Sequence, residues 1–402
     1  MAKRREWIIV AVCILLTTTA FGFGMYLIPM VLPEMTSGLG LDYARIGTIT
    51  GGSQVAALLA IPMADLVVRR FGALSTIITA HFSAALLLAG VYDLQGFLDF
   101  FCLSFLLRTW PVMTWIPMVV VAAEHLPLNW RPTFFTLVSA ASCVCVSFDG
   151  FFSSWFLTHS NWRAMWMAAS MINVGVGLIS LAALKCCGAL GGPSKKTMPT
   201  QTSPGEGLTA WLKSPGGILL NAIFLISGLT FISFPVYLAP YLREELNTGL
   251  STITLMWSVM GLAGIPAGLI FSVIVARMGI KFSFVLIFTL GITAAACLGG
   301  APAMVPMTLS AASFGTAQAV IYGMGPAYLS KVLSVSAASK AFALGTAIMT
   351  IGGLIGNFLG GWSSDLLGSF KWAYMATGIL FAVGALLSIL LVPKSLEPTG
   401  NH

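Results

Sequence analysis

The sequence predicts an all-α membrane protein with twelve transmembrane helices in two pseudo-symmetric six-helix bundles. Of its 402 residues, 57% are hydrophobic and 8% are charged, and the mean hydropathy is +0.93; about a quarter of the residues of a soluble protein are charged. The apolar residues form runs long enough to cross a bilayer, which takes about 20 residues per helix. The two halves of the chain also match each other at a fixed offset. Together these observations exclude a soluble enzyme.

Twelve apolar runs have this length, separated by charged residues or by Gly and Pro. We expect spans at 7–32, 46–68, 73–92, 97–123, 133–157, 163–184, 214–240, 251–276, 281–300, 303–329, 340–363 and 371–392. The first run follows three basic residues, as a signal peptide does. It is longer than a signal core and lacks a clear small-residue cleavage site, so we interpret it as a retained helix. Prolines that are expected to bend the helices are Pro29, Pro33, Pro111, Pro117, Pro235 and Pro240.

One long polar connection divides the chain. We interpret residues 186–213 as a cytoplasmic linker between an N-terminal six-helix bundle, 1–185, and a C-terminal six-helix bundle, 214–402. An offset of about 207 residues places Arg70-Phe71-Gly72 on Arg277-Met278-Gly279. Parallel repeats of six spans are a known transporter plan, with the substrate site near the membrane midplane between the repeats.

The basic residues predict the orientation of the helices. Fifteen of the 20 Lys and Arg residues fall on the connections of one side and four on those of the other. Because basic residues are retained in the cytoplasm, we expect both termini there, with the chain in an inner membrane. The basic residues are scattered singly, so the net charge of +7 does not indicate a nucleic-acid partner. The expected partners of this monomer are the bilayer and a small-molecule solute, with protons as a candidate coupling ion.

The sequence contains no constellation that indicates catalysis. Its four histidines are far apart, the seven cysteines lack metal-type or disulfide-type spacing, and no phosphate-binding loop is present. We therefore expect no enzymatic activity, no cofactor and no metal site. Transport energy would have to come from a gradient.

Short motifs in both halves carry a family resemblance. Spans five and six open on Asn129-Trp130-Arg131 and Asn161-Trp162-Arg163, and the second half carries Gly360-Gly361-Trp362 and Gly368-Ser369-Phe370-Lys371-Trp372. On these residues nearly the whole chain resembles the major facilitator superfamily. The resemblance implies two bundles that rock about a central site and a secondary transporter; it does not identify the solute.

The loop between spans two and three departs from the pattern of this family, usually Gly-x-x-x-Asp-Arg-x-Gly-Arg-Arg. Here Asp65 stands at the usual Gly position and Arg69 at the usual Asp, followed by Arg70. The second half keeps Arg277 and also lacks the Asp. We expect these four residues to form a rewired gate in which Asp65 and Arg69 pair locally. The alternative is a solvated helix end.

Three ionisable side chains lie deep inside the spans, where they are costly and hence functional candidates: His81, Arg108 and Asp149. Arg108 matches an arginine often found on the fourth span of the family and could hold a carboxylate or phosphate. Arg108 and Asp149 share a similar depth, roughly 12 to 17 Å below the outer surface, so the alternative is a packing ion pair. Asp149 is either a protonation switch or a permanently paired carboxylate. His81 is either a proton shuttle or a packing residue.

Neutral polar and aromatic side chains are expected to complete the substrate site. The candidates are Tyr26, Trp115, Asn221, Tyr237, Gln318 and Tyr322, although aromatic side chains also form belts at the membrane surface. The leading hypothesis is a secondary active transporter that moves a small organic anion, a metabolite or siderophore-like compound, by alternating access, with symport and antiport both open. The alternatives are a proton-driven exporter of amphipathic compounds, including drugs, and a transport-dead receptor.

Overall fold

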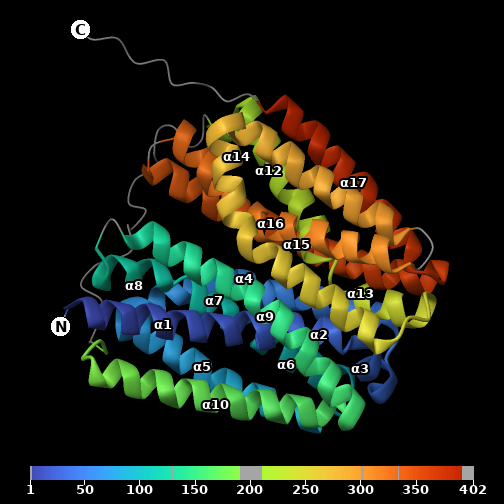
Figure 1. Cartoon of the computed structure of the whole chain (residues 1–402), viewed down its shortest axis with the longest axis horizontal. Coiled ribbons are helices and arrows are strands. Elements are labelled where there is room, and N and C mark those ends of the chain that lie inside the picture. Colours follow the sequence, from blue (N-terminus) through green and yellow to red (C-terminus); the bar gives the residue numbers. More distant parts are fainter. Residues whose placement is uncertain (1, 128–129, 191–210, 300–302, 334, 392–402) are drawn as a thin grey trace.

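The computed structural model describes residues 2–127, 130–190, 211–299, 303–333 and 335–391. Almost all of this part is helical, and the long helices run side by side (Figure 1). The first half contains α1 (Ala2–Phe21), η1 (Gly22–Tyr26), α2 (Leu27–Met30), α3 (Leu32–Leu39), α4 (Tyr43–Phe71), α5 (Ala73–Gly90), η2 (Val91–Asp93), α6 (Phe97–Leu107), α7 (Thr109–Trp115), α8 (Met118–His125), α9 (Arg131–His159) and α10 (Trp162–Cys186). The second half contains α12 (Pro215–Ser227), η4 (Gly228–Ile232), α13 (Leu238–Pro240), η5 (Tyr241–Glu245), α14 (Leu250–Leu298), α15 (Met304–Val332), α16 (Val335–Leu367) and α17 (Lys371–Leu390).

The helix lengths agree with twelve membrane spans. Within the described residues, eleven helical segments are long and apolar enough to cross a bilayer. One of them, α14, is 49 residues long and covers two expected spans, 251–276 and 281–300. Its backbone leaves the helical region at Gly279, with φ 84° and ψ 163°, so the single segment is two helices joined at this bend.

The internal repeat is visible in the backbone. Gly72 ends α4 with φ 86°, and Gly279, 207 positions later, has φ 84°. These values lie in a region that is essentially restricted to glycine. Gly40 and Asn247, again 207 positions apart, both have left-handed φ values, 62° and 51°. A π-helix interrupts the first long helix of each half, at η1 and at η4.

Two helix pairs form the seam between the bundles. Figure 1 shows α1 to α10 in one group and α12 to α17 in the other. Helix α4 packs along α16, and α9 packs along α14. The Ser147 hydroxyl donates to the Ser258 carbonyl at 2.9 Å, and Asn357 Nδ2 donates to the Thr50 carbonyl at 3.2 Å. The proposed linker at 186–213 stays a prediction, because 191–210 lie outside the described residues.

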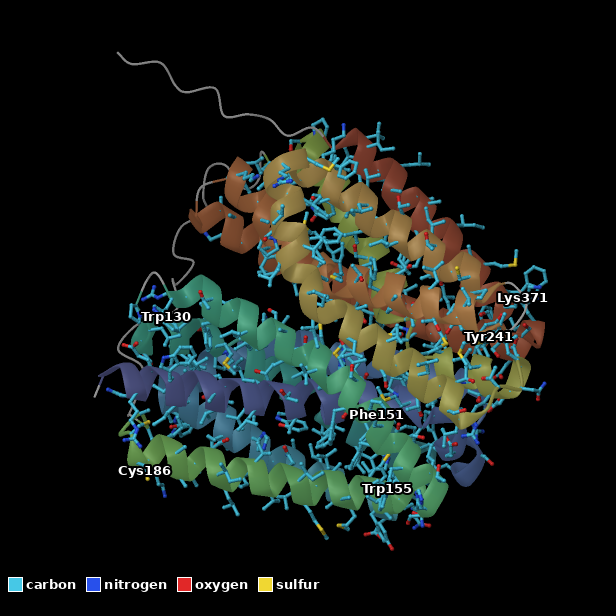
Figure 2. The ribbon with its side chains drawn as sticks, viewed as in Figure 1. Trp130, Phe151, Trp155, Cys186, Tyr241 and Lys371 are labelled. Atoms are coloured by element: carbon cyan, nitrogen blue, oxygen red, sulfur yellow. The ribbon has the colours of Figure 1, made fainter. Side chains whose placement is uncertain are left out.

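Polar contacts join the two bundles at one end of the molecule, which we call the far end. It holds Tyr241 and Lys371, whereas Trp130 and Cys186 lie at the opposite end (Figure 2). Three contacts each link the first half to the second: an ion pair between Glu34 and Arg243, a hydrogen bond from the Tyr43 hydroxyl to Glu244 Oε1 (2.6 Å) and one from the Ala44 amide to Asp365 Oδ2 (2.7 Å). The far end is therefore closed in this structure.

Two expected spans are broken rather than continuous. The expected span 97–123 consists of α6, α7 and α8. Helix α6 ends at Leu107 because Pro111, four residues later, has no N–H to donate to the Leu107 carbonyl. The expected span 214–240 is helical only as far as Ile232, and a run of turns precedes Leu238. Pro235 lies in that run and cannot continue the backbone ladder.

Candidate functional site

A small cavity lies between the two bundles. Its volume is about 50 Å³. The first half contributes Gly24, Met25, Tyr26, Ile28, Pro29, Thr50, Ser53, Gln54, Ser104 and Arg108, and the second half contributes Ile232, Pro235, Val236 and Asn357. Because both bundles line it, any rocking of one against the other changes its shape. Transporters built from two such repeats bind their substrates at the interface between the repeats.

Arg108 is the charged group of this cavity. It stands at the junction of α6 and α7, where Pro111 interrupts the backbone ladder, and its side chain is partly buried. Its Nη2 donates to Gln54 Oε1 at 3.1 Å. Tyr26 and Tyr322 lie within electrostatic range of the guanidinium. Among the described residues, neither the cavity lining nor any ion pair supplies a carboxylate to Arg108.

Two buried polar atoms on the cavity wall have no hydrogen-bond partner. They are Ser104 Oγ and Asn357 Oδ1, on side chains that are 6% and 1% exposed. The other polar atoms of Asn357 are used, since Nδ2 bonds to Thr50 and the backbone carbonyl accepts from the Tyr237 hydroxyl. Burying such atoms without a partner is costly. A solute or water that bonds to them would remove that cost.

Asp149 is fully buried on α9, and neither of its carboxylate oxygens has a hydrogen-bond partner among the described residues. The carboxylate rests against the start of η1: an ideal Cβ placed on Gly22 would lie 2.7 Å from Asp149 Oδ2 and 3.2 Å from Cys145 Cβ. The alternative of a packing ion pair between Arg108 and Asp149 is not among the ion pairs of the described residues. Arg108 faces α4, while Asp149 faces the start of the π-helix in the first span. Two side chains at a similar depth in the membrane need not point toward each other.

His81 lies away from the cavity. It is fully buried on α5, and its Nε2 lies 2.8 Å from the Asn173 carbonyl. Asn173 Nδ2 donates back to the His81 carbonyl at 2.9 Å, and the Trp110 ring packs edge-on at 5.4 Å. These reciprocal contacts join α5 to α10. They support the packing interpretation of His81, and its role in proton coupling stays a prediction.

The cavity contains some of the predicted substrate-binding residues and not others. Tyr26 and Arg108 line it, and Tyr237 reaches it through the Asn357 carbonyl. Gln318 instead donates to the Phe231 carbonyl at 3.3 Å inside the second bundle. The remaining candidates, which are not part of the lining, are Trp115 (37% exposed, packed edge-on against Phe21), Asn221 on α12 and Tyr322 (39% exposed).

The predicted gate residues lie at helix ends. Arg69 and Asp65 form the expected local ion pair, with Nη2 and Oδ2 2.7 Å apart. Arg70 stacks over the Phe71 ring, and Arg277 is exposed two residues before the bend at Gly279. Their role in gating remains a prediction.

Sequence reasoning missed the polar face of α4. Thr50, Ser53 and Gln54 all line the cavity. Neutral side chains inside an apolar run indicate a functional site much less clearly than a charged side chain does. The available signal was the stretch from Gly51 to Gln54, which is the least apolar part of its span. Asn357 is likewise a neutral polar residue inside an apolar span.

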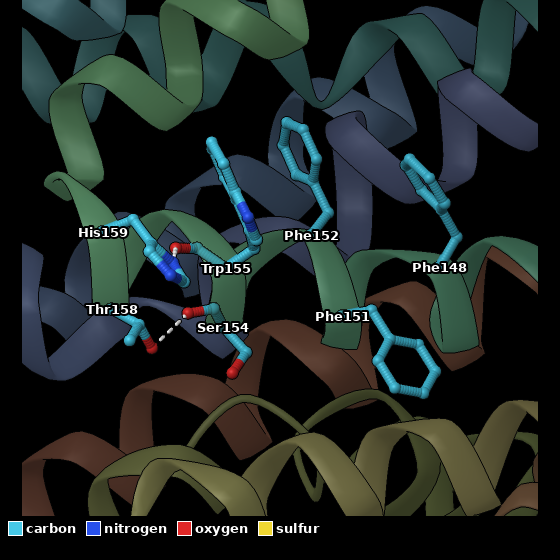
Figure 3. Close-up of a pocket in the computed structure, with 7 residues that line it drawn as sticks. All are labelled: Phe148, Phe151, Phe152, Ser154, Trp155, Thr158 and His159. Carbon is cyan, nitrogen blue, oxygen red and sulfur yellow. Dashed lines mark hydrogen bonds between the residues drawn. The ribbon is translucent and has the colours of Figure 1, made fainter.

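A larger cavity of about 520 Å³ lies along α9 (Figure 3). Its lining is Phe148, Phe151, Phe152, Ser154, Trp155, Thr158 and His159. The rings of Trp155 and His159 stack with their centroids 5.2 Å apart. All seven residues belong to one apolar span, and none of the predicted site residues lines this cavity. It is a lateral aromatic face rather than a site between the bundles.

Comparisons with known proteins agree with this architecture. The family model of the major facilitator superfamily matches residues 14–312 and 219–402. No curated protein has a significant match to the sequence. Among solved structures, a mutant of the nucleoside transporter NupG has a TM-score of 0.77 at 14% identity, covering 96% of this chain and 99% of that chain. A bacterial homologue of the human lysosomal transporter Spinster, inward-facing and unoccupied, has a TM-score of 0.71 at 13% identity, covering 96% of each. The likeness to these structures concerns the fold, and the family match extends over nearly the whole sequence: this chain is a membrane transporter that belongs to the major facilitator superfamily.

Proposed function

We propose that the protein is a secondary transporter of a small organic anion, and that Arg108 binds the anionic group. The observation that carries this proposal is an arginine in a cavity shared by both bundles, bonded to a neutral amide and without a carboxylate among its described neighbours. A guanidinium presents five donors in a planar fork that fits a carboxylate or phosphate bidentately. An anion is the partner that best satisfies this group.

The size of the cavity supports a mechanism of alternating access. Ligand pockets usually hold about 300 to 1,000 Å³, whereas this cavity holds about 50 Å³ with the far end closed. A solute therefore enters only when the bundles separate around it. The far-end contacts between Glu34 and Arg243, and between Tyr43 and Glu244, have to break when that end opens.

Proton coupling through Asp149 is the second part of the proposal. An ionised carboxylate buried without a partner is costly, and both oxygens of Asp149 are in that situation. A bound proton removes the charge and lets the side chain rest against Gly22. We further propose an inner-membrane monomer with both termini in the cytoplasm, in line with the distribution of its basic residues.

A neutral polar solute, such as a nucleoside, is the second candidate. The free Ser104 Oγ and Asn357 Oδ1 favour it, since hydroxyl and N–H groups of a solute would satisfy them without any charge. The fold neighbour NupG is a nucleoside transporter. The two candidates differ in what they require of Arg108, because only the anion needs its charge.

Thermal stabilisation of the purified protein tests both candidates. The panel contains lactate, malate, citrate, glycerol 3-phosphate, uridine and adenosine, measured with wild type, Arg108→Gln and Arg45→Gln. The last variant is the matched control, since Arg45 is an exposed arginine paired with Asp42 at the far end. We expect one of the anions to stabilise wild type and the control, and to lose at least tenfold in affinity in Arg108→Gln. Equal binding of that anion by Arg108→Gln rejects the anion proposal, and stabilisation by a nucleoside alone supports the second candidate.

A further inference from the structure

Gln54 is the side chain that accepts a hydrogen bond from Arg108 in the cavity between the bundles. Gln54 lies on α4 and is 4% exposed, so its amide is held inside the protein. Its Oε1 accepts from Arg108 Nη2 at 3.1 Å. The two side chains belong to different helices of the first bundle, and both contribute to the cavity wall. An anion that Arg108 binds in this cavity would therefore lie close to Gln54.

A solute anion can replace the hydrogen bond between Arg108 and Gln54, because Gln54 is a weaker acceptor than an anion. The amide oxygen of Gln54 is a neutral acceptor, whereas the oxygens of a carboxylate or phosphate carry charge and attract the guanidinium more strongly. A carboxylate or phosphate also accepts two parallel bonds from the guanidinium. An anion therefore displaces Gln54 from Arg108. When no anion is bound, Gln54 supplies the guanidinium with a hydrogen-bond acceptor in a weakly polar site.

Gln54 also lies next to the seam between the bundles. Thr50 is four residues earlier and so lies on the same face of α4. The Thr50 carbonyl accepts from Asn357 Nδ2 on α16 of the other bundle at 3.2 Å. A solute that displaces Gln54 therefore acts one helical turn from a contact that joins the bundles.

We propose that Gln54 is an internal substitute for the transported anion. It holds Arg108 in the empty carrier and releases it to the solute. This inference rests on the proposed function of Arg108 as the anion anchor. The proposal predicts the mode of transport. Because Arg108 always has an acceptor, the carrier can pass through its closed states without a bound solute. Net transport is then possible without obligatory exchange.

The proposal makes opposite predictions for two substitutions of similar size. In Gln54→Met the competing acceptor is gone, so anion affinity increases by about tenfold. The empty carrier then has an unsatisfied Arg108, and net uptake becomes about tenfold slower while exchange of internal for external anion keeps its rate. In Gln54→Glu a fixed carboxylate occupies Arg108, so anion affinity decreases by tenfold or more.

The experiment compares wild type, Gln54→Met, Gln54→Glu, Arg108→Gln and the remote control Gln95→Leu in proteoliposomes. Gln95 donates to the Asp93 carbonyl in an exposed loop. Net uptake, exchange and affinity are measured with the panel anion that stabilises wild type. Reduced affinity in both Gln54 variants would show that Gln54 is a direct solute ligand and overturn the proposal, and so would an unchanged ratio of net uptake to exchange in Gln54→Met. Equal affinity in wild type and Arg108→Gln is a different failure, that of the proposed function.

A second measurement needs no solute. Phenylglyoxal modifies accessible arginine side chains, and peptide mass spectrometry reports the rate at Arg108. We expect that rate to increase severalfold in Gln54→Met relative to wild type. Arg163 is the internal reference, because its guanidinium is held by the carbonyls of Tyr92 and Leu94. An unchanged Arg108 rate in a folded Gln54→Met protein shows that Gln54 does not hold the guanidinium and overturns the proposal even if no panel anion binds.

Discussion

The packing of Asp149 against Gly22 gives a prediction whose size follows from the structure. A methyl group added at Gly22 would place its Cβ 2.7 Å from Asp149 Oδ2 and 3.1 Å from Oδ1. Real Cβ atoms do not approach oxygen so closely, so the Asp149 side chain, η1 or α9 has to shift. Overpacking of this kind costs about 1 to 3 kcal/mol. Gly22→Ala should therefore lower the apparent melting temperature by roughly 2 to 6 °C.

A double-mutant cycle identifies the cause of that loss. Asp149→Ala removes both oxygens, so it should change stability little by itself and restore most of the loss in the double variant. Contact with Cys145 Cβ, 3.2 Å from the added atom, leaves a small residual strain. The expected coupling between the two sites is about 1 to 2 kcal/mol. The assay is thermal unfolding of the four proteins in one detergent. Additive effects, with no recovery in the double variant, would refute the assigned contact.

Three further perturbations follow from the same structure. Asp149→Asn should permit counterflow exchange but abolish accumulation driven by a pH gradient, and full accumulation would reject proton coupling through this residue. Pro111→Ala restores a backbone donor and should straighten the helix next to Arg108. We expect the anion affinity to decrease several-fold, with the thermal stability kept or raised. An unchanged affinity would show that the helix break does not position the arginine. Glu34→Gln weakens the ion pair with Arg243. Amide hydrogen exchange should therefore accelerate in segments 32–39 and 241–249. Unchanged exchange in these segments would show that this pair does not hold the far end closed.

The spans and the repeat were predictable because they depend on one-dimensional patterns. Run length against bilayer thickness located the spans, including the two that α14 joins through Gly279. The offset that aligns Gly72 with Gly279 in the sequence recurs in the backbone, where both have positive φ values. Arg108 was predictable for a related reason, since a charge inside an apolar run needs a polar site.

The partners of these residues were not predictable, because they depend on how each helix is rotated about its axis. Depth along the membrane suggested that Arg108 and Asp149 meet, but the rotation of α6 and α9 turns them toward Gln54 and Gly22. Gln54 itself has only a weak signature in the sequence, the low apolarity of the stretch from Gly51 to Gln54. A neutral amide costs far less than a charge in an apolar span, so only its position beside Arg108 distinguishes it.

The π-helices η1 and η4 provide a reserve of chain length in the first membrane span of each half. Each π turn holds one residue more than an α turn would, and each ends on a residue of the central cavity, Tyr26 in η1 and Ile232 in η4. Moving such a turn by one position toward the start of its helix rotates the intervening side chain by about 100°. The wall of the cavity can therefore be reshaped by a local twist of one helix in each half, while the rest of that helix keeps its packing.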